Sequence, residues 1–431
     1  MRSLLGVDHH LLARCRSFPL KYSRNFTSNE VVRKRGRPPK AKAALEQLPN
    51  TVVDDPTSEK SRSLAASLNR YSDLPPLPPV DDWLSHFPFA PIVVRDRISI
   101  RDPVTAIRVA ESFVDSKKTS TKKPKVIIEA FPGPGALSRA FLTLPPDKLK
   151  KLIILEDHEP YLEYLRPLAR ADPRVRVVPQ SGFNWDTYSY LLESGDLDPF
   201  HTLHARAVHP ELHFVTHIPQ NIPGEQLVAQ LFRCIPENSW LFKYGRVPMS
   251  FILADWVWRR ISAPPKGIER CKLSVIAESS SRFSPSLPPE DLSPFFEHFH
   301  PATTSVRTGG SALRPETRRR GSPFLAVNVV PHAEQIITKG KLDQWDYILR
   351  RLFVLKSTPL RGAISSLAPG AEVLLDKLTD KRLPLEQRVD IRLPVKQLTV
   401  SDWVLIARAF DAWPFAPEVH LPTYSSYQVI N

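Results

Sequence analysis

Short apolar runs alternate with stretches of helical periodicity between residues 126 and 331. The runs are rich in β-branched residues, which favour buried strands, and they lie at 126–128, 152–155, 175–178 and 213–215. Parallel strands joined by crossover helices give this alternation. The sequence therefore predicts an α/β sheet, with one more strand at 325–330.

The chain beyond Pro331 shows helical periodicity. Residues 345–356 and 370–378 predict helices. We therefore expect a small helical domain over residues 332–418, followed by a tail over residues 419–431.

The α/β domain is expected to span residues 81–331. Its first long helix is predicted to follow Asp102, because this side chain can cap a helix and Pro103 suits the first turn. Residues 280–322 are polar and rich in proline, so we expect a long surface loop there.

The N-terminal region has no clear periodicity. Residues 26–80 are basic and then rich in Ser, Asp and Pro, and the prolines at 74–79 favour an extended, disordered linker. Residues 1–25 combine basic and apolar side chains with one acid, Asp8, as a mitochondrial presequence does. A disordered basic tail is the alternative interpretation of residues 1–25.

The composition indicates the number of folded units and the charge of the partner. The chain has 431 residues, of which 42% are hydrophobic, so it can form two folded units. Its net charge of +14 favours a polyanionic partner such as nucleic acid. Residues 1–50 carry eleven Lys and Arg against three acids, which is more than half of the excess.

The cysteines are few and scattered. Cys15, Cys234 and Cys271 form no CxxC pair, so the sequence predicts neither a disulfide framework nor a metal site. No apolar run approaches the length that crosses a bilayer, and we expect no transmembrane segment.

Residues 33–40 form a basic cluster with a Gly-Arg-Pro core. This cluster resembles an AT-hook, in which extended Arg side chains enter the narrow minor groove of A·T-rich DNA. Arg35 and Arg37 are the candidate contacts, and a basic linker is the alternative.

A glycine-containing turn follows the first predicted strand. Residues 129–138 read Glu-Ala-Phe-Pro-Gly-Pro-Gly-Ala-Leu-Ser, so Gly133 and Gly135 let the backbone approach a ligand closely. Glu156 ends the second strand, 21 residues after Gly135, where a carboxylate can accept hydrogen bonds from ribose hydroxyls. Ordinary turns also contain glycines and acids, and that alternative stays open.

This turn resembles the S-adenosylmethionine motif of the rRNA adenine dimethyltransferase family. Further segments resemble the family in the same order along the chain, at 97–106, 256–265, 272–275, 347–353 and 367–371. The resemblance implies a Rossmann-like, S-adenosylmethionine-dependent methyltransferase fold with a small C-terminal helical domain. It also implies a cofactor site, which would contain Glu129, Phe131, Gly133, Gly135, Glu156 and Ser181.

Two departures from the family affect that cofactor site. Phe131 stands where the family usually has its first glycine, and its side chain would press on the methionine end of the cofactor. Ser181 or Gln180 stands where an Asp normally bonds the adenine ring of the cofactor. We expect S-adenosylmethionine binding to be weakened or lost.

The catalytic loop departs further from the family. Active members have an Asn-Leu-Pro-aromatic loop that receives the flipped adenine. Gapless alignment gives His217, Ile218, Pro219 and Gln220 here, whereas a shifted register starting at Asn221 restores the Asn but still lacks the aromatic ring. The loop is therefore expected to be inactive, and His217 is expected to be a hydrogen-bonded residue rather than a metal ligand.

This pattern of loss resembles the mitochondrial transcription factor branch of the family. The resemblance implies a monomeric factor in the mitochondrial matrix that helps a single-subunit RNA polymerase to melt promoter DNA. Lys243, Tyr244 and Arg246 are candidate nucleic-acid contacts, whereas Trp240 and Phe242 are expected in the core of a strand. The alternatives are an active rRNA dimethyltransferase with rRNA as its partner, and an RNA-binding assembly factor without catalysis.

Overall fold

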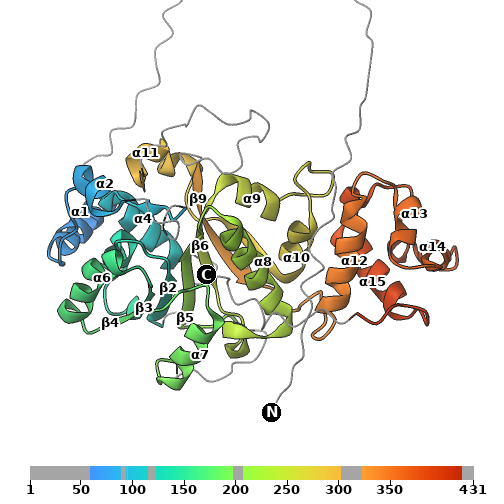
Figure 1. Ribbon diagram of the computed structural model, residues 1–431, viewed down its shortest axis with the longest axis horizontal. Helices are drawn as coiled ribbons and strands as arrows, with labels where there is room; N and C mark the ends of the chain where they lie inside the picture. The colour runs from blue at the N-terminus through green and yellow to red at the C-terminus, as the bar shows by residue number, and fades with distance from the viewer. Residues whose placement is uncertain are drawn as a thin grey trace, which may run out of the picture. The chain divides into compact units, whose positions relative to one another are not determined.

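The computed structural model describes residues 59–88, 94, 96–114, 123–197, 207–301 and 323–419. The presequence, the AT-hook-like cluster with Arg35 and Arg37, and residues 420–431 lie outside these ranges. The described chain is built around a seven-stranded sheet with the strand order β4-β3-β2-β5-β6-β9-β7 (Figure 1).

Five of the seven strands of this sheet are parallel, and the apolar runs predicted all of these except the strand at residues 249–254. They are β2 (Lys125–Ala130), β3 (Leu149–Leu155), β4 (Val175–Val178), β5 (Leu212–His217) and β6 (Met249–Ala254). The predicted strand before residue 331 is also confirmed, as β9 (Phe324–Pro331), which pairs antiparallel with β6. The three innermost strands β2, β5 and β6 are buried along their whole length, which explains their continuous apolar sequences.

The strand order reverses direction between β2 and β5. From β2 the chain moves outward to β3 and β4, and then crosses back to β5 and β6. Right-handed crossovers place the helices of the two halves on opposite faces, which leaves a crevice at the carboxyl ends of the two central strands. Ligands of open α/β sheets bind at such a point.

The helices between these strands are α5 (Ala136–Leu142), α6 (Glu159–Ala171), α7 (Trp185–Glu193) and α8 (Ile222–Glu237). α4 (Pro103–Val114) precedes β2, and α9 (Asp255–Ile261) and α10 (Lys272–Ser280) follow β6. The predicted cap of α4 is confirmed, because the Asp102 carboxylate accepts the Thr105 N–H at 2.8 Å.

The N-terminal boundary differs from our expectation of a disordered linker up to residue 80. Residues Glu59–Ser72 form helix α1, which packs on α4 and α5. Its partly buried residues Leu64, Leu68 and Tyr71 follow helical spacing, but the polar residues around them obscured this pattern in the sequence.

The proline-rich residues 74–79 also belong to the folded domain. The buried Arg139 side chain donates to the carbonyl of Pro75 at 2.8 Å, and the Trp83 indole donates to the carbonyl of Pro78 at 3.0 Å. Proline carbonyls remain good acceptors although prolines lack an N–H. These two bonds attach the segment to α5 and to α2 (Trp83–His86).

The predicted surface loop at 280–322 is partly wrong. Its described first half contains β7 (Ser281–Pro285), α11 (Phe295–His298) and β8 (Phe299–His300). β7 pairs with β9 at the edge of the main sheet, and β8 pairs with β1 (Ser99–Ile100) in a separate two-stranded sheet. Isolated buried residues such as Phe299 anchor this region, and they are too widely spaced to show a period.

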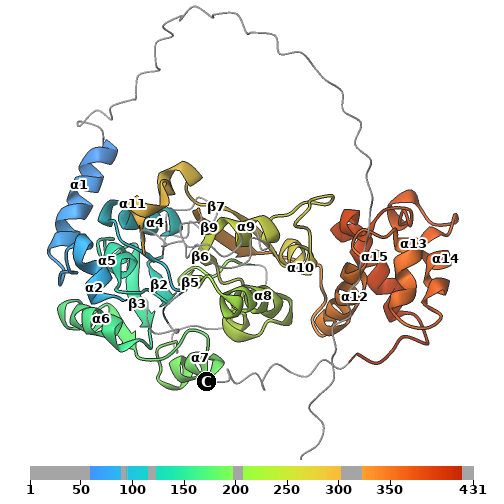
Figure 2. The same cartoon turned by 45° about the horizontal axis from the view of Figure 1, so that its top comes forward.

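Within residues 332–419, four α-helices follow the sheet, at α12 (Leu342–Val354), α13 (Leu360–Ala363), α14 (Leu374–Thr379) and α15 (Val400–Asp411). The helices predicted at 345–356 and 370–378 correspond to α12 and α14, although residues 371–373 form a 3-10 turn. Both views place α12 beside α8 and α10 (Figure 2).

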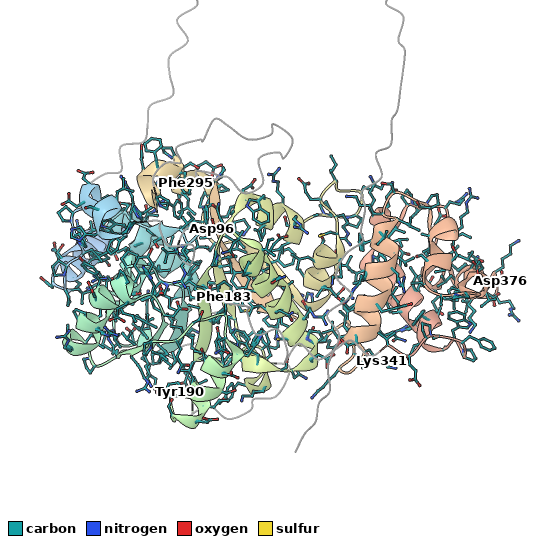
Figure 3. All side chains as sticks on the ribbon, in the orientation of Figure 1. Asp96, Phe183, Tyr190, Phe295, Lys341 and Asp376 are labelled. Carbon is teal, nitrogen blue, oxygen red and sulfur yellow. The ribbon has the colours of Figure 1, made fainter. Side chains whose placement is uncertain are left out.

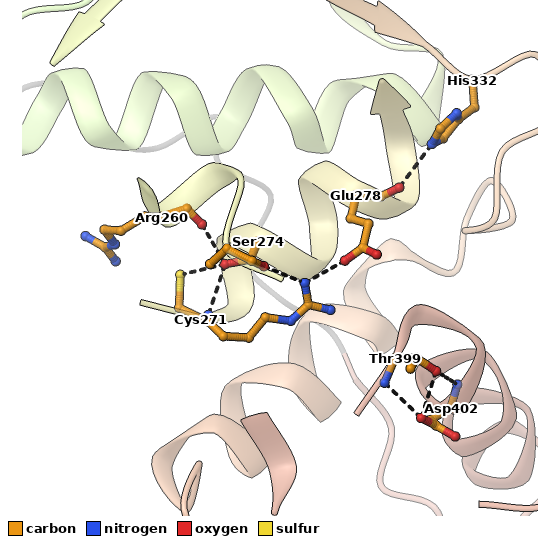
Figure 4. A network of polar contacts seen from close by, with 9 residues as sticks. Arg260, Cys271, Ser274, Glu278, His332, Thr399 and Asp402 are labelled. Carbon is orange, nitrogen blue, oxygen red and sulfur yellow. Dashed lines mark hydrogen bonds and ion pairs between the residues drawn. The ribbon is translucent and has the colours of Figure 1, made fainter. Parts of the chain in front are cut away.

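The start of α10 is held by a polar network (Figure 4). The Ser274 hydroxyl accepts the backbone N–H of Cys271 at 3.0 Å and donates to the carbonyl of Arg260 at 2.6 Å. The buried Arg270 guanidinium bonds the carbonyl of Ala263 and the Glu278 carboxylate. The loop between α9 and α10 is thereby fixed against both helices.

Candidate functional site

The turn after β2 lies at the reversal point of the sheet. Gly133 and Gly135 both have left-handed backbones, with φ of 61° and 91°. A Cβ at Gly133 would lie 2.0 Å from the Ser99 hydroxyl, so that only glycine fits there. The turn therefore holds its shape through backbone geometry, as the sequence motif predicted.

Glu129 lies inside β2 just before this turn and is almost completely buried. One carboxylate oxygen accepts the Ser138 hydroxyl at 2.6 Å, while Oε1 has no hydrogen-bond partner among the described residues. Burial raises the pKa of Glu129 to about 8, although the Ser138 hydrogen bond opposes the rise. Glu129 is therefore predominantly protonated at neutral pH.

Glu156 follows β3 and is also buried. Its Oε1 accepts the Arg97 guanidinium at 2.5 Å and the backbone N–H groups of Asp157 and His158 at 3.0 and 2.9 Å. Its Oε2 is buried without a partner in the described part of the chain. Burial raises the pKa of the Glu156 carboxyl, and the charge of Arg97 opposes that rise.

Phe131 is the first residue after β2 and begins the turn. It has φ of 58°, a left-handed conformation that is uncommon for a non-glycine residue. Its ring lies 4.5 Å from the ring of Phe183, centroid to centroid, and the Arg97 guanidinium carbon lies 5.2 Å from its centroid. The side chain thus fills space beside the turn.

Ser181 lies close to the same pocket, in the segment after β4. Its side chain hydrogen-bonds Asp157, next to Glu156, while Gln180 is partly buried nearby in sequence. The structure thus brings the six predicted cofactor residues to one end of the sheet, with Asp96 and Phe183 nearby (Figure 3). In this conformation a ribose hydroxyl can reach neither oxygen of Glu156, because the Glu156 side chain is 0% exposed.

The degenerate catalytic loop directly follows β5, the neighbour of β2. His217 is the last residue of β5, and the Gln220 N–H donates to the carbonyl of Asp96 at 2.8 Å. The residues His217 and Gln220 are each 5% exposed, and burial lowers the pKa of His217 to about 3. His217 is therefore neutral and enclosed; its Nε2 has no hydrogen-bond partner among the described residues.

Asn221 serves a structural purpose. Its side chain accepts the Gly224 N–H at 2.8 Å and caps α8. Gly224 itself lies against the loop, because a Cβ there would meet the Pro219 carbonyl oxygen at 2.1 Å. The gapless register, with His217, Pro219 and Gln220 in the loop, is the one that this geometry supports.

The predicted nucleic-acid residues Lys243, Tyr244 and Arg246 lie away from this loop. They precede β6, whereas the loop and the turn follow the carboxyl ends of their parallel strands. Tyr244 is buried and Arg246 donates to the carbonyl of Pro331 at 2.8 Å, so that only Lys243 is exposed. The segment is a 3-10 helix, Trp240–Tyr244, rather than the predicted strand, and Phe242 is buried in it.

The described residues contain no group of His, Cys, Asp or Glu arranged to hold a metal ion. Among the same residues, no helix is both long and apolar enough to cross a bilayer.

Comparison with known proteins identifies the family. The profile of the ribosomal RNA adenine dimethylases matches residues 109–411. The chain belongs to this family. The likeness covers the sheet, the turn, the loop after β5 and helices α12 to α15, and the family's fold is the Rossmann-like methyltransferase fold with a C-terminal helical domain.

The chain resembles curated relatives with two kinds of name. It is 25% identical to mitochondrial transcription factor 1 of Saccharomyces paradoxus, over 76% of this chain and 92% of that protein. It is 20% identical to a mitochondrial dimethyladenosine transferase 1 of Vermamoeba vermiformis, over 80% of this chain and 97% of that protein. The solved structure of the 23S rRNA methyltransferase ErmE aligns with a TM-score of 0.44 and 14% identity, covering 73% of this chain and 99% of that one.

Proposed function

We propose that this dimethylase-family chain is a mitochondrial transcription initiation factor. It would bind promoter DNA and help a single-subunit RNA polymerase to melt it, in the mitochondrial matrix. The likeness to a protein named mitochondrial transcription factor 1, over 92% of that protein and 76% of this chain, supports this proposal, and it supports a mitochondrial location in general.

The observation that carries the proposal is the loop after β5. A flipped adenine needs an aromatic ring to stack on and a polar side chain facing the pocket. Here His217 and Gln220 are enclosed by protein, Asn221 caps a helix, and the loop contains no aromatic residue. Loss of one stack alone weakens base capture by about 1–3 kcal/mol, so the loop is poorly suited to methyl transfer.

Binding of promoter DNA requires positive charge rather than proton chemistry. The net charge of +14 provides it, and it is concentrated before residue 51, where Arg35 and Arg37 are the proposed minor-groove contacts. Lys243 is the exposed cation that remains a candidate from the sequence-based set.

Run-off transcription from a mitochondrial promoter with the cognate polymerase tests this function. We expect initiation to depend on the added chain, and 2-aminopurine in the promoter to brighten as the duplex opens. An Arg35→Ala/Arg37→Ala double variant should bind the promoter more weakly, and its affinity should depend less steeply on salt, by the slope of roughly two phosphate contacts. Lys339→Gln serves as the control variant. Initiation that is unaffected by the chain would contradict the proposal.

Active rRNA dimethylation is the second candidate function. The retained turn with Gly133 and Gly135 and the buried acids Glu129 and Glu156 favour it, as does the likeness to a dimethyladenosine transferase. Incorporation of labelled methyl groups into small-subunit rRNA at normal turnover would establish it over the first proposal. Association with rRNA that is independent of promoters and of methylation would instead support an assembly factor.

A further inference from the structure

Arg97 lies against the acid and the turn that resemble the family's methyl-donor motif. It comes from the segment before α4, yet its guanidinium reaches Glu156 at 2.5 Å and Asp157 at 2.7 Å, at the end of β3. The Arg97 side chain is only 5% exposed. A buried cation with two carboxylate partners is a fixed part of the pocket and not a surface charge.

Arg97 contacts the same carboxylate that would bind the ribose of a methyl donor. A ribose is recognised through its hydroxyls by a carboxylate at the end of the second strand, which is Glu156 here. Glu156 Oε1 already accepts one guanidinium and two backbone N–H groups. Since the remaining oxygen, Oε2, is enclosed, no acceptor surface is left for a ligand.

Phe131 closes the pocket from the other side. Its ring lies under the Arg97 guanidinium and against Phe183. A Cβ at Gly182 would lie 3.2 Å from the Phe131 ring, so the ring also fills the space up to the segment after β4. Arg97, Phe131 and Phe183 form a continuous layer across the pocket, which we call the internal plug.

We propose that Arg97 is an internal occupant of the methyl-donor site, held there by Glu156 and Phe131, so that the chain excludes the donor with its own side chains. The arginine satisfies the buried carboxylate that a ribose would otherwise satisfy. It also fastens the segment before α4 to the sheet, beside Asp96, whose carbonyl holds the loop after β5. This inference stands whether or not the chain acts in transcription.

Calorimetric titration with S-adenosylhomocysteine, the stable product of the donor, tests the internal plug. The wild-type chain should show no saturable binding up to millimolar concentrations. Arg97→Ala and Phe131→Gly should each open the pocket, and the double variant should bind with a Kd of about 0.1 mM or below, at least tenfold under the millimolar limit set by wild type. Arg108→Ala, which removes an exposed and paired arginine from the neighbouring α4, is the matched control and should stay like wild type.

Thermal unfolding gives an independent measurement. A ligand that binds only the folded chain raises the midpoint, so S-adenosylhomocysteine should stabilise the opened variants and leave wild type and Arg108→Ala unchanged. Micromolar binding by wild type would overturn the proposal without any variant. If Arg97→Ala does not fold, Phe131→Gly keeps the test open, and a folded Phe131→Gly chain that gains no binding would equally overturn it.

Discussion

Replacement of Asp346 by asparagine should loosen the junction between the sheet and the C-terminal helices. Asp346 lies on α12 with its side chain 0% exposed, and its oxygens pair with Arg233 of α8 at 2.6 Å and Lys272 of α10 at 2.8 Å. Arg350 adds a third cation at 2.6 Å. Of the three, only the Arg233 side chain is largely buried, at 10% exposed, so the loss of its 2.6 Å pair costs the most, even though Asp343 also lies 3.5 Å from its guanidinium.

The expected loss follows from that difference in burial. Breaking a buried ion pair costs about 3–5 kcal/mol, whereas the exposed Lys272 and Arg350 can turn to water at little cost. Asparagine keeps a hydrogen-bond acceptor, which places the estimate at the lower end, about 3 kcal/mol. With a urea dependence of about 3 kcal/mol per molar, the unfolding midpoint should fall by roughly 1 M.

Urea unfolding followed by tryptophan fluorescence measures this shift, because Trp345 adjoins Asp346 on α12. Asp376→Asn is the matched control, since Asp376 is an exposed carboxylate of α14 (Figure 3) and should stay within about 0.5 kcal/mol of wild type. Burial acts to raise the pKa of Asp346, but Arg233 and Lys272 outweigh it, and the net pKa is lowered. The ion pair therefore stabilises above the unfolded pKa of about 3.9, and the gap between wild type and variant should close as the pH falls below it. Equal midpoints for the two variants at neutral pH would refute this reasoning.

Three further predictions concern the turn and the loop. Burial raises the pKa of Glu129 to about 8, so the protonated side chain stabilises the folded chain fully at acid pH, and this stabilisation is lost as the pH rises through that value. The urea midpoint of Glu129→Gln should therefore rise relative to that of wild type between about pH 5 and about pH 8.5. A difference that stays constant with pH would contradict this prediction. Gly224→Ala should destabilise by about 1–3 kcal/mol through contact with the Pro219 carbonyl, whereas Gly362→Ala, whose Cβ has room, should be neutral or stabilising in the same urea titration. Asn221→Ala removes the side chain that caps α8, so it should lower the stability in thermal unfolding by about 1 kcal/mol, whereas Asn221→Asp keeps a capping oxygen and should not. Equal losses in the two variants would argue against the capping assignment.

The sheet could be predicted from the sequence because its strands are buried on both faces. Continuous apolar runs such as 152–155 therefore indicated directly where the strands lie, and the Asp102–Pro103 pair indicated where α4 begins. Helix α1 was missed because its apolar residues contact the domain along a narrow stripe among polar neighbours. β7 was missed because edge strands bury less and tolerate serine and proline.

The backbone of the candidate site could be predicted from the sequence, but the side-chain contacts within the site could not. Glycine positions and the acid that follows β3 are local signals, and the structure brings them together as the motif implies. Arg97 lies 59 residues from Glu156, and nothing in a sequence of scattered arginines distinguishes the one that enters a pocket. Tyr244 shows the converse, because an aromatic residue beside a cation can fill the core as readily as it can stack on a base.

The two buried carboxyls of the pocket show how such a site can lose its ligand and remain folded. An unpaired carboxylate enclosed by protein is costly, so each must be neutralised or paired. Glu129 is neutralised by a proton, as its raised pKa indicates, and Glu156 is paired with Arg97. Removal of the Phe131 ring alone therefore opens the pocket only in part, because Glu156 must still exchange a charged partner for a neutral diol. This requirement predicts that the gain in ligand binding from Arg97→Ala and Phe131→Gly together exceeds the sum of the two separate gains in free energy.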